Sequence, residues 1–155
     1  MEDKICSLFG HRQFSVSQAK KEDVKKEIVR LIENEGVNVF YLGGKGIFDE
    51  FCATYIFELK KKYPHIKSFL IIAYLNEKMS EYDEDRIKKI YNGTIYPDIE
   101  KVPLKFAILK RNEWMINRSS LCLFYLNWSW GGAYKTFEVA KRKHKRYINL
   151  GDLEI

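Results

Sequence analysis

The sequence predicts an α/β protein, a three-layer sandwich in which a mainly parallel sheet of about five strands is covered by helices on both faces. Short apolar runs of strand length alternate along the chain with longer segments that repeat hydrophobic residues at helical spacing. The apolar runs are nearly continuous, as strands covered on both faces require. The chain has 155 residues, so we expect one domain over residues 1–155.

The elements follow from these patterns in chain order. The expected strands are the apolar runs at 4–9, 38–42, 68–73, 121–126 and 146–150. The expected helices lie at about 17–35, 48–62, 104–119 and 133–143. The stretch 76–103 looks less regular, with one short helical candidate near 84–90. Because long irregular stretches in a compact domain often form lids or binding loops, we expect such a role here.

Composition excludes several classes of protein. Hydrophobic residues make up 46% of the chain, which argues against disorder. No apolar run approaches the roughly 20 residues of a membrane helix, so we expect no membrane partner. The start of the chain lacks the cationic segment of a secretory signal, which favours the cytoplasm. The cysteines and histidines show no metal-ligand spacing, so we expect neither a metal nor a cofactor.

The formal charge is +6, and much of the excess lies in the basic run 141–146. One interpretation is a solvated helix end, where cations offset the helix dipole. The other is a patch that binds anions. We favour the first interpretation.

Three expected strands end in unusual turns: Gly10-His11-Arg12, Gly43-Gly44-Lys45-Gly46 and the segment 127–132. Ligands of parallel α/β sheets bind at the carboxyl ends of the strands, so these turns should share one rim. Glycine allows backbone N–H groups to approach a phosphate, and the following helix adds a favourable dipole. The turns match neither the P-loop nor the dinucleotide fingerprint, and tight packing also requires glycine.

Several side chains near these turns could contact a ligand. Asn127 and Thr136 offer amide and hydroxyl groups, while Trp128 and Trp130 could stack on a base. Arg12 could make paired hydrogen bonds to a phosphate. Each of these residues could equally serve packing or lie on the surface.

The turns resemble motifs of the YpsA-like proteins in the SLOG superfamily. Gly10-His11-Arg12 resembles their TGHR turn, with Phe9 in place of threonine. The segment 43–49, which ends in Asp49, resembles GG-x-G-x-x-D. The segment 111–120, which begins with Arg111, resembles RNxxMxxxSD. The motifs keep their order over nearly the whole chain. The resemblance implies a Rossmann-like fold that binds a nucleotide or a nucleotide-derived ligand.

The superfamily includes the LOG enzymes, which cleave the base from a nucleoside monophosphate, and the DNA-binding DprA proteins. LOG catalysis uses an arginine and a glutamate of a glycine turn. The resemblance carries these roles to Arg111 and to Glu138, which follows the turn Gly131-Gly132-Ala133. Glu50, after the earlier turn, matches the spacing better but lies on the wrong strand for the family order.

Three functions remain open from the sequence. The first is the binding or sensing of a nucleotide-derived ligand, with its phosphate on the glycine turn 43–46 or 131–133 and its charge balanced by Arg12 and Arg111. The second is a nucleoside monophosphate N-glycosidase that uses Glu138, Glu50 or Asp49. The third is single-stranded nucleic-acid binding through the basic run and aromatics. LOG-like relatives also imply a homodimer.

Overall fold

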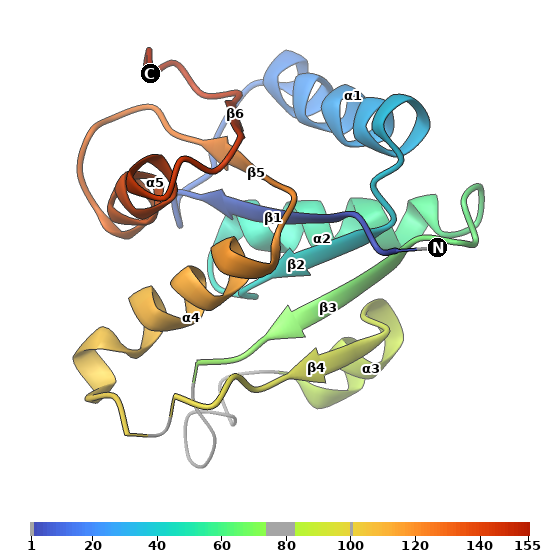
Figure 1. Cartoon of the computed structure of the whole chain (residues 1–155). Coiled ribbons are helices and arrows are strands. Elements are labelled where there is room, and N and C mark those ends of the chain that lie inside the picture. The colour runs from blue at the N-terminus through green and yellow to red at the C-terminus, as the bar shows by residue number, and fades with distance from the viewer. Residues whose placement is uncertain (1, 74–82, 100) are drawn as a thin grey trace.

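Helices and strands alternate along the part of the chain that the computed structural model describes, residues 2–73, 83–99 and 101–155 (Figure 1). In chain order the elements are β1 (Ile5–Gly10), α1 (Gln18–Glu35), β2 (Val39–Leu42), α2 (Ile47–Leu59), β3 (Lys67–Ile71), α3 (Glu84–Ile90), β4 (Gly93–Ile95), α4 (Leu104–Arg118), β5 (Leu121–Tyr125), α5 (Gly132–Arg142) and β6 (Tyr147–Asn149). The predicted α/β class is confirmed.

The strands form one parallel sheet in the order β4-β3-β2-β1-β5-β6. The central strand β1 pairs with β2 on one side and with β5 on the other, and Ser7 lies opposite both Tyr41 and Cys122. The chain therefore winds outward from β1 to β4 and then returns to the other side of β1. This reversal places the switch point of the sheet between β1 and β5, where ligands of such folds bind.

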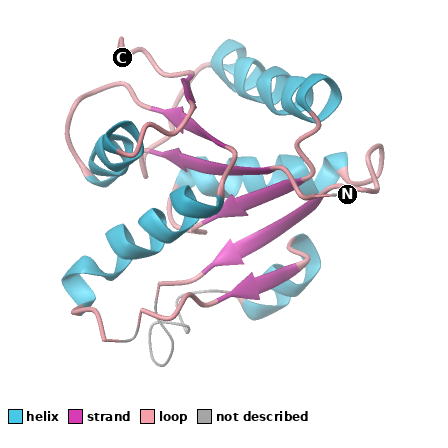
Figure 2. Cartoon of the chain, viewed as in Figure 1, coloured by secondary structure: helices cyan, strands magenta, loops and turns pink. Residues whose placement is uncertain are grey.

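Helices cover both faces of the sheet, which makes three layers (Figure 2). Helices α1 and α2 pack on one face, where Ile28, Ile56 and Leu8 are buried together. Helices α4 and α5 pack on the other, where Met115 and Phe137 are buried against the strands. Side chains of β1 and β5 alternate between the two cores, as the pleat of a strand requires. The expected sandwich with apolar strands is thus confirmed.

One strand, β4, has no counterpart among the strands expected from the sequence. β4 is a three-residue edge strand that pairs with β3, so the sheet has six strands instead of about five. It begins with Gly93 and is too short to produce a strand pattern of its own. Asn92 holds its start, because its side chain accepts a hydrogen bond from the Ser68 N–H at 2.9 Å. The helix predicted near 84–90 is confirmed as α3, while residues 74–82 of the expected lid lie outside the described residues.

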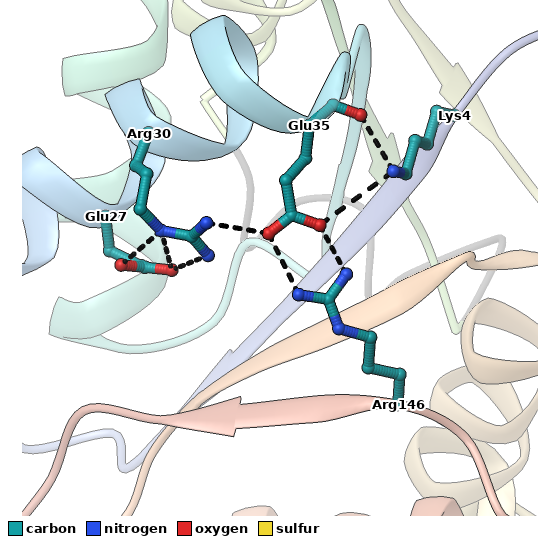
Figure 3. Close-up of polar contacts among 5 residues, drawn as sticks. All are labelled: Lys4, Glu27, Arg30, Glu35 and Arg146. Carbon is teal, nitrogen blue, oxygen red and sulfur yellow. Dashed lines mark hydrogen bonds and ion pairs between the residues drawn. The ribbon is translucent and has the colours of Figure 1, made fainter.

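An ion-pair network ties the opposite rim of the sheet together (Figure 3). The carboxylate of Glu35, the last residue of α1, pairs with Arg30 at 2.8 Å and with Arg146 just before β6. Lys4, before β1, donates to the Glu35 carbonyl oxygen at 2.7 Å. The hydrogen bond from Arg146, with a further one from Arg30, lowers the pKa of Glu35 to about 2. The end of the basic run thus has a structural role.

Candidate functional site

A cavity of about 550 Å³ opens at the carboxyl ends of β1, β2 and β5. Its volume lies within the range of pockets that enclose small organic ligands. All three unusual turns contribute to its wall, as the sequence analysis expected of one shared rim. The expected site residues that line it are Gly10, His11, Arg12, Gly43, Lys45, Asp49, Arg111, Trp130, Gly131, Gly132 and Ala133.

Two of the proposed catalytic carboxylates do not line this cavity. Glu138 is exposed on α5, and Glu50 contributes to a smaller cavity of about 180 Å³ beside α3, where it pairs with Arg86. Each step along a helix turns the side chain by about 100°, so Glu50 points away from the direction of its neighbour Asp49. Among the cavity-lining residues, Asp49 is the carboxylate. The structure therefore places Glu50 and Glu138 outside the wall of this cavity, and the catalytic roles given to them stay predictions.

Asp49 lies in the first turn of α2 and is only 8% exposed. The Lys45 backbone N–H donates to its carboxylate at 3.3 Å. Burial raises the pKa of Asp49 to about 7, although Arg111, backbone N–H groups and Arg12 all favour the charged form. Near neutral pH this carboxyl group therefore exists in both protonation states and can accept or donate a hydrogen bond.

Arg111 extends from α4 across the ends of β2 and β3 and is 3% exposed. Its Nη1 donates to the carbonyl oxygens of Gly43 at 3.2 Å and Ile71 at 2.8 Å. Its Nε donates to the Asn112 side chain at 2.7 Å. The guanidinium thus joins two strand ends to a helix while it also forms part of the cavity wall.

The glycine turn after β2 is explained by packing. A Cβ at Gly43 would lie 2.7 Å from the guanidinium carbon of Arg111. Gly46 has a φ of 94°, and a Cβ there would lie 2.7 Å from the Arg12 Cα. The N-terminus of α2 also has Asp49 and Glu50 in its first turn, which complement the helix dipole. This turn therefore offers little unused capacity for an anion.

The glycine turn after β5 is different. A Cβ at Gly131 or Gly132 would meet nothing within 4 Å, and both residues line the cavity. Gly131 is required by its φ of 92°, whereas no packing contact requires Gly132. No described side chain caps α5, and its first turn holds no acidic residue. This helix end therefore borders the cavity with neither a side-chain cap nor an acidic residue in its own first turn.

A chain of buried hydrogen bonds connects Arg111 to this turn. Asn112 accepts from Arg111 and donates to the Thr136 hydroxyl at 2.9 Å, and that hydroxyl donates to the Gly132 carbonyl oxygen at 3.0 Å. We expected Thr136 to contact a ligand, but it is fully buried and does not line the cavity. Its hydroxyl instead bonds to the turn at Gly132. Asn112 also lines the cavity, although it was not among the expected site residues. The signal for it in the sequence was its position directly after Arg111 in the segment 111–120.

Aromatic rings form a ladder on the same side of the cavity. The His11 ring stacks on Trp128 with centroids 3.9 Å apart, and Trp128 stacks on Trp130 at 5.0 Å. His11 Nε2 accepts the Asn127 backbone N–H at 3.0 Å, and burial lowers the pKa of His11. The outermost ring, Trp130, is 66% exposed.

The end of β6 and the segment after it hold the loop that carries Trp128 and Trp130. The Asn149 side chain accepts from the Leu126 N–H at 2.8 Å and donates to the Leu153 carbonyl oxygen at 2.8 Å. The Asn127 side chain accepts from the Asp152 N–H at 2.8 Å. Asn127 therefore anchors the loop and, contrary to expectation, does not line the cavity. Nothing in the sequence pointed to Asn149.

Replacing Gly151 by alanine is expected to loosen this anchor. A Cβ at Gly151 would lie 2.1 Å from the Leu126 carbonyl oxygen, so one backbone segment must move. We expect a loss of about 1–3 kcal/mol in the free energy of unfolding, measured by urea titration. Gly93→Ala is the control, because its Cβ meets Phe69 at an ordinary 3.5 Å. Equal stability of Gly151→Ala and the unchanged chain would contradict this account of the anchor.

The basic run lies away from the cavity. Helix α5 begins at the cavity with Gly132, and Arg142 is its last residue, about 15 Å further along the helix axis. Lys145 donates to the Ser119 carbonyl oxygen at 2.6 Å, and Arg146 pairs with Glu35. This arrangement agrees with the interpretation of the run as a solvated helix end with structural contacts. No helix in the described ranges is long and apolar enough to cross a membrane.

A doubly wound parallel sheet with a cavity above β1, β2 and β5 defines a Rossmann-like α/β protein. The family model YpsA, described as the YspA SLOG family, matches residues 6–150. The chain therefore belongs to this SLOG family, as the turn motifs indicated.

Two relatives support this assignment. A UPF0398 protein of Halalkalibacterium halodurans is 27% identical over 160 residues, which cover 95% of this chain and 83% of the relative. A UPF0398 protein of Brevibacillus brevis is 36% identical over 78 residues, and the match spans 49% of this chain and 41% of that relative.

Solved structures share the fold at low sequence identity. DprA of Streptococcus pneumoniae has a TM-score of 0.64 at 17% identity, and the match covers 95% of this chain and 50% of that one. DprA of Helicobacter pylori has a TM-score of 0.63 at 14% identity, with 94% and 64% covered. The Moco carrier protein of Chlamydomonas rheinhardtii has a TM-score of 0.51 at 12% identity, with 97% and 77% covered.

Proposed function

We propose that this protein binds a phosphate-bearing, nucleotide-derived ligand in the cavity, with the phosphate on the backbone N–H groups of Gly131, Gly132 and Ala133. One observation carries the proposal: this uncapped helix N-terminus opens into the cavity beside a glycine that no packing contact requires. Uncapped N–H groups and the positive end of the helix dipole together favour an anion.

The charges around the cavity support an anionic ligand. Arg12 and Lys45 line it, and the buried guanidinium of Arg111 forms part of its wall. The one carboxylate among the lining residues, Asp49, has a pKa of about 7, so it is protonated in a large fraction of molecules at neutral pH. Both the SLOG family and the DprA-like fold are consistent with a ligand at this rim.

Gly132→Asp tests the phosphate position without harm to the fold. A Cβ at Gly132 enters open space, and an acidic side chain in the first turn of a helix favours the helix dipole. The new carboxylate would occupy and neutralise the N–H groups that the phosphate needs. We expect at least about a tenfold loss of affinity for ribose 5-phosphate and nucleoside monophosphates in calorimetric titrations, with an equal or higher melting temperature.

The neutral variant Gly132→Asn is the matched control for side-chain size, and we expect it to keep most of the affinity. The proposal fails if Gly132→Asp binds these probes as tightly as the unchanged chain. It also fails if the unchanged chain binds none of them.

The same cavity supports a second candidate, a nucleoside monophosphate N-glycosidase. Cleavage of a glycosidic bond needs a carboxyl group that can donate or accept a proton near the sugar. Asp49 is buried in the cavity wall with a pKa of about 7, which suits a general acid at neutral pH. Chromatography of nucleoside monophosphates incubated with the protein would show free base. Release that Asp49→Asn abolishes would favour the enzyme, whereas binding without release favours the first function.

Single-stranded nucleic acid ranks third. The Helicobacter pylori DprA structure concerns a single-stranded DNA binding mode, but the basic run of this chain lies at the end of α5 that is distant from the cavity. Binding of a labelled oligonucleotide at two salt concentrations would separate specific binding from the affinity of any basic protein.

A further inference from the structure

We propose that the exposed face of Trp130 is the base subsite of the cavity, so that the ligand is a mononucleotide whose aromatic base extends the ladder of His11, Trp128 and Trp130. This inference rests on the proposed function, because it adds a second subsite beside the phosphate position.

The stack of His11, Trp128 and Trp130 ends in an exposed ring on which one more ring could stack. Its planes are nearly parallel, with 13° between His11 and Trp128 and 21° between Trp128 and Trp130. His11 is buried, whereas 66% of Trp130 is exposed, so the stack runs from a buried ring to an exposed indole, and both rings line the cavity. Nucleobases stack on such faces, and stacking depends little on which base is present.

Trp130 is next to the proposed phosphate position along the chain. It directly precedes Gly131, so the ring and the proposed phosphate position are adjacent on one loop. In a nucleotide one ribose separates the base from the phosphate. A sugar phosphate without a base would leave the indole uncovered.

The loop that carries Trp128 and Trp130 is fixed by hydrogen bonds within the protein. His11 accepts the Asn127 N–H, the Asn127 side chain accepts the Asp152 N–H, and Asn149 holds both backbone groups of Leu126. A platform that is already fixed saves the entropy of ordering it on binding, which favours affinity. Among the described residues, Phe106 on α4 also has an exposed aromatic side chain, but it is outside the ladder and does not line the cavity.

The test compares ligands with and without a base on the full chain. The probes are the monophosphates of adenosine, guanosine, cytidine and uridine, together with ribose 5-phosphate. We expect the best mononucleotide to bind at least about tenfold more tightly than ribose 5-phosphate, and to quench indole fluorescence. In Trp130→Ala the advantage of the base should fall to within about twofold.

Trp130→Phe should restore part of the advantage, since a smaller ring still stacks, and Phe106→Ala should leave it intact. The inference is overturned if ribose 5-phosphate binds as tightly as every mononucleotide, or if Trp130→Ala keeps the full advantage of the base. It is also overturned if only oligonucleotides bind. If none of the small probes binds the unchanged chain, the proposed function fails together with the base subsite.

Discussion

Replacing Asp49 by asparagine is expected to stabilise the protein much more at pH 8 than at pH 5. The pKa of Asp49 is raised from 3.8 to about 7, chiefly by burial, so the folded state binds this proton more tightly than the unfolded chain. The contribution of Asp49 to the free energy of unfolding is therefore fully present at low pH, and it falls as the pH rises from about 4 to about 7. An amide does not titrate, so the variant escapes this loss. A rise of the pKa from 3.8 to about 7 corresponds to a relative gain of about 2–3 kcal/mol between pH 5 and pH 8.

Urea unfolding of both proteins at the two pH values measures this difference directly. Glu138→Gln, which removes an exposed carboxylate of α5, controls for the loss of one negative charge. A difference between Asp49→Asn and the unchanged chain that stays constant with pH would show that Asp49 ionises normally. Its role as a neutral-pH proton donor in the cavity would then be untenable.

At high pH, Asp49→Asn should bind anions more tightly than the unchanged chain does. When Asp49 is ionised, its charge opposes a phosphate in the same cavity, and the protonated form removes that repulsion. We expect the affinity of the unchanged chain for nucleoside monophosphates to fall as the pH rises through 7, and that of Asp49→Asn to fall less. Titrations at pH 6 and pH 8 check this, and parallel slopes for the two proteins would contradict it.

The sequence predicted the helices and most strands because their signals are local. A strand covered on both faces, such as β5, is a continuous apolar run, and a helix such as α1 repeats its buried residues at helical spacing. The edge strand β4 lacks such a signal. Its three residues are extended because they pair with β3 and because Asn92 bridges to Ser68, and both contacts join distant parts of the chain.

The sequence predicted that the three turns lie at one edge of the sheet, but it did not predict which of them leaves space for a ligand. Glycine after a strand marks a turn, but it does not tell whether the space is left for a ligand or for another side chain. At Gly43 that space is filled by Arg111, and at Gly132 it is open. The anchoring of the loop by Asn149 depends on contacts across 23 residues, so no spacing in the sequence announces it.

Replacing Arg111 by alanine is expected to cost about 4 kcal/mol in the free energy of unfolding. The change removes the buried hydrogen bonds from Arg111 to the carbonyl oxygens of Gly43 and Ile71 and to the Asn112 side chain. The loss of these buried hydrogen bonds and the empty volume of the side chain both destabilise the fold. Arg111→Lys should recover only part of the loss, because an ammonium cannot reproduce the planar fork of donors.

The contact with Gly43 allows a sharper test of the same arginine. Gly43→Ala alone should destabilise the protein, since its Cβ would lie 2.7 Å from the guanidinium carbon. In the Arg111→Ala background the guanidinium is gone, so the same substitution should cost little. We expect a coupling free energy of about 1–3 kcal/mol from urea unfolding of the double-mutant cycle. Additive losses would mean that Gly43 is required by something other than Arg111, and a ligand phosphate at the turn after β2 would again become a candidate.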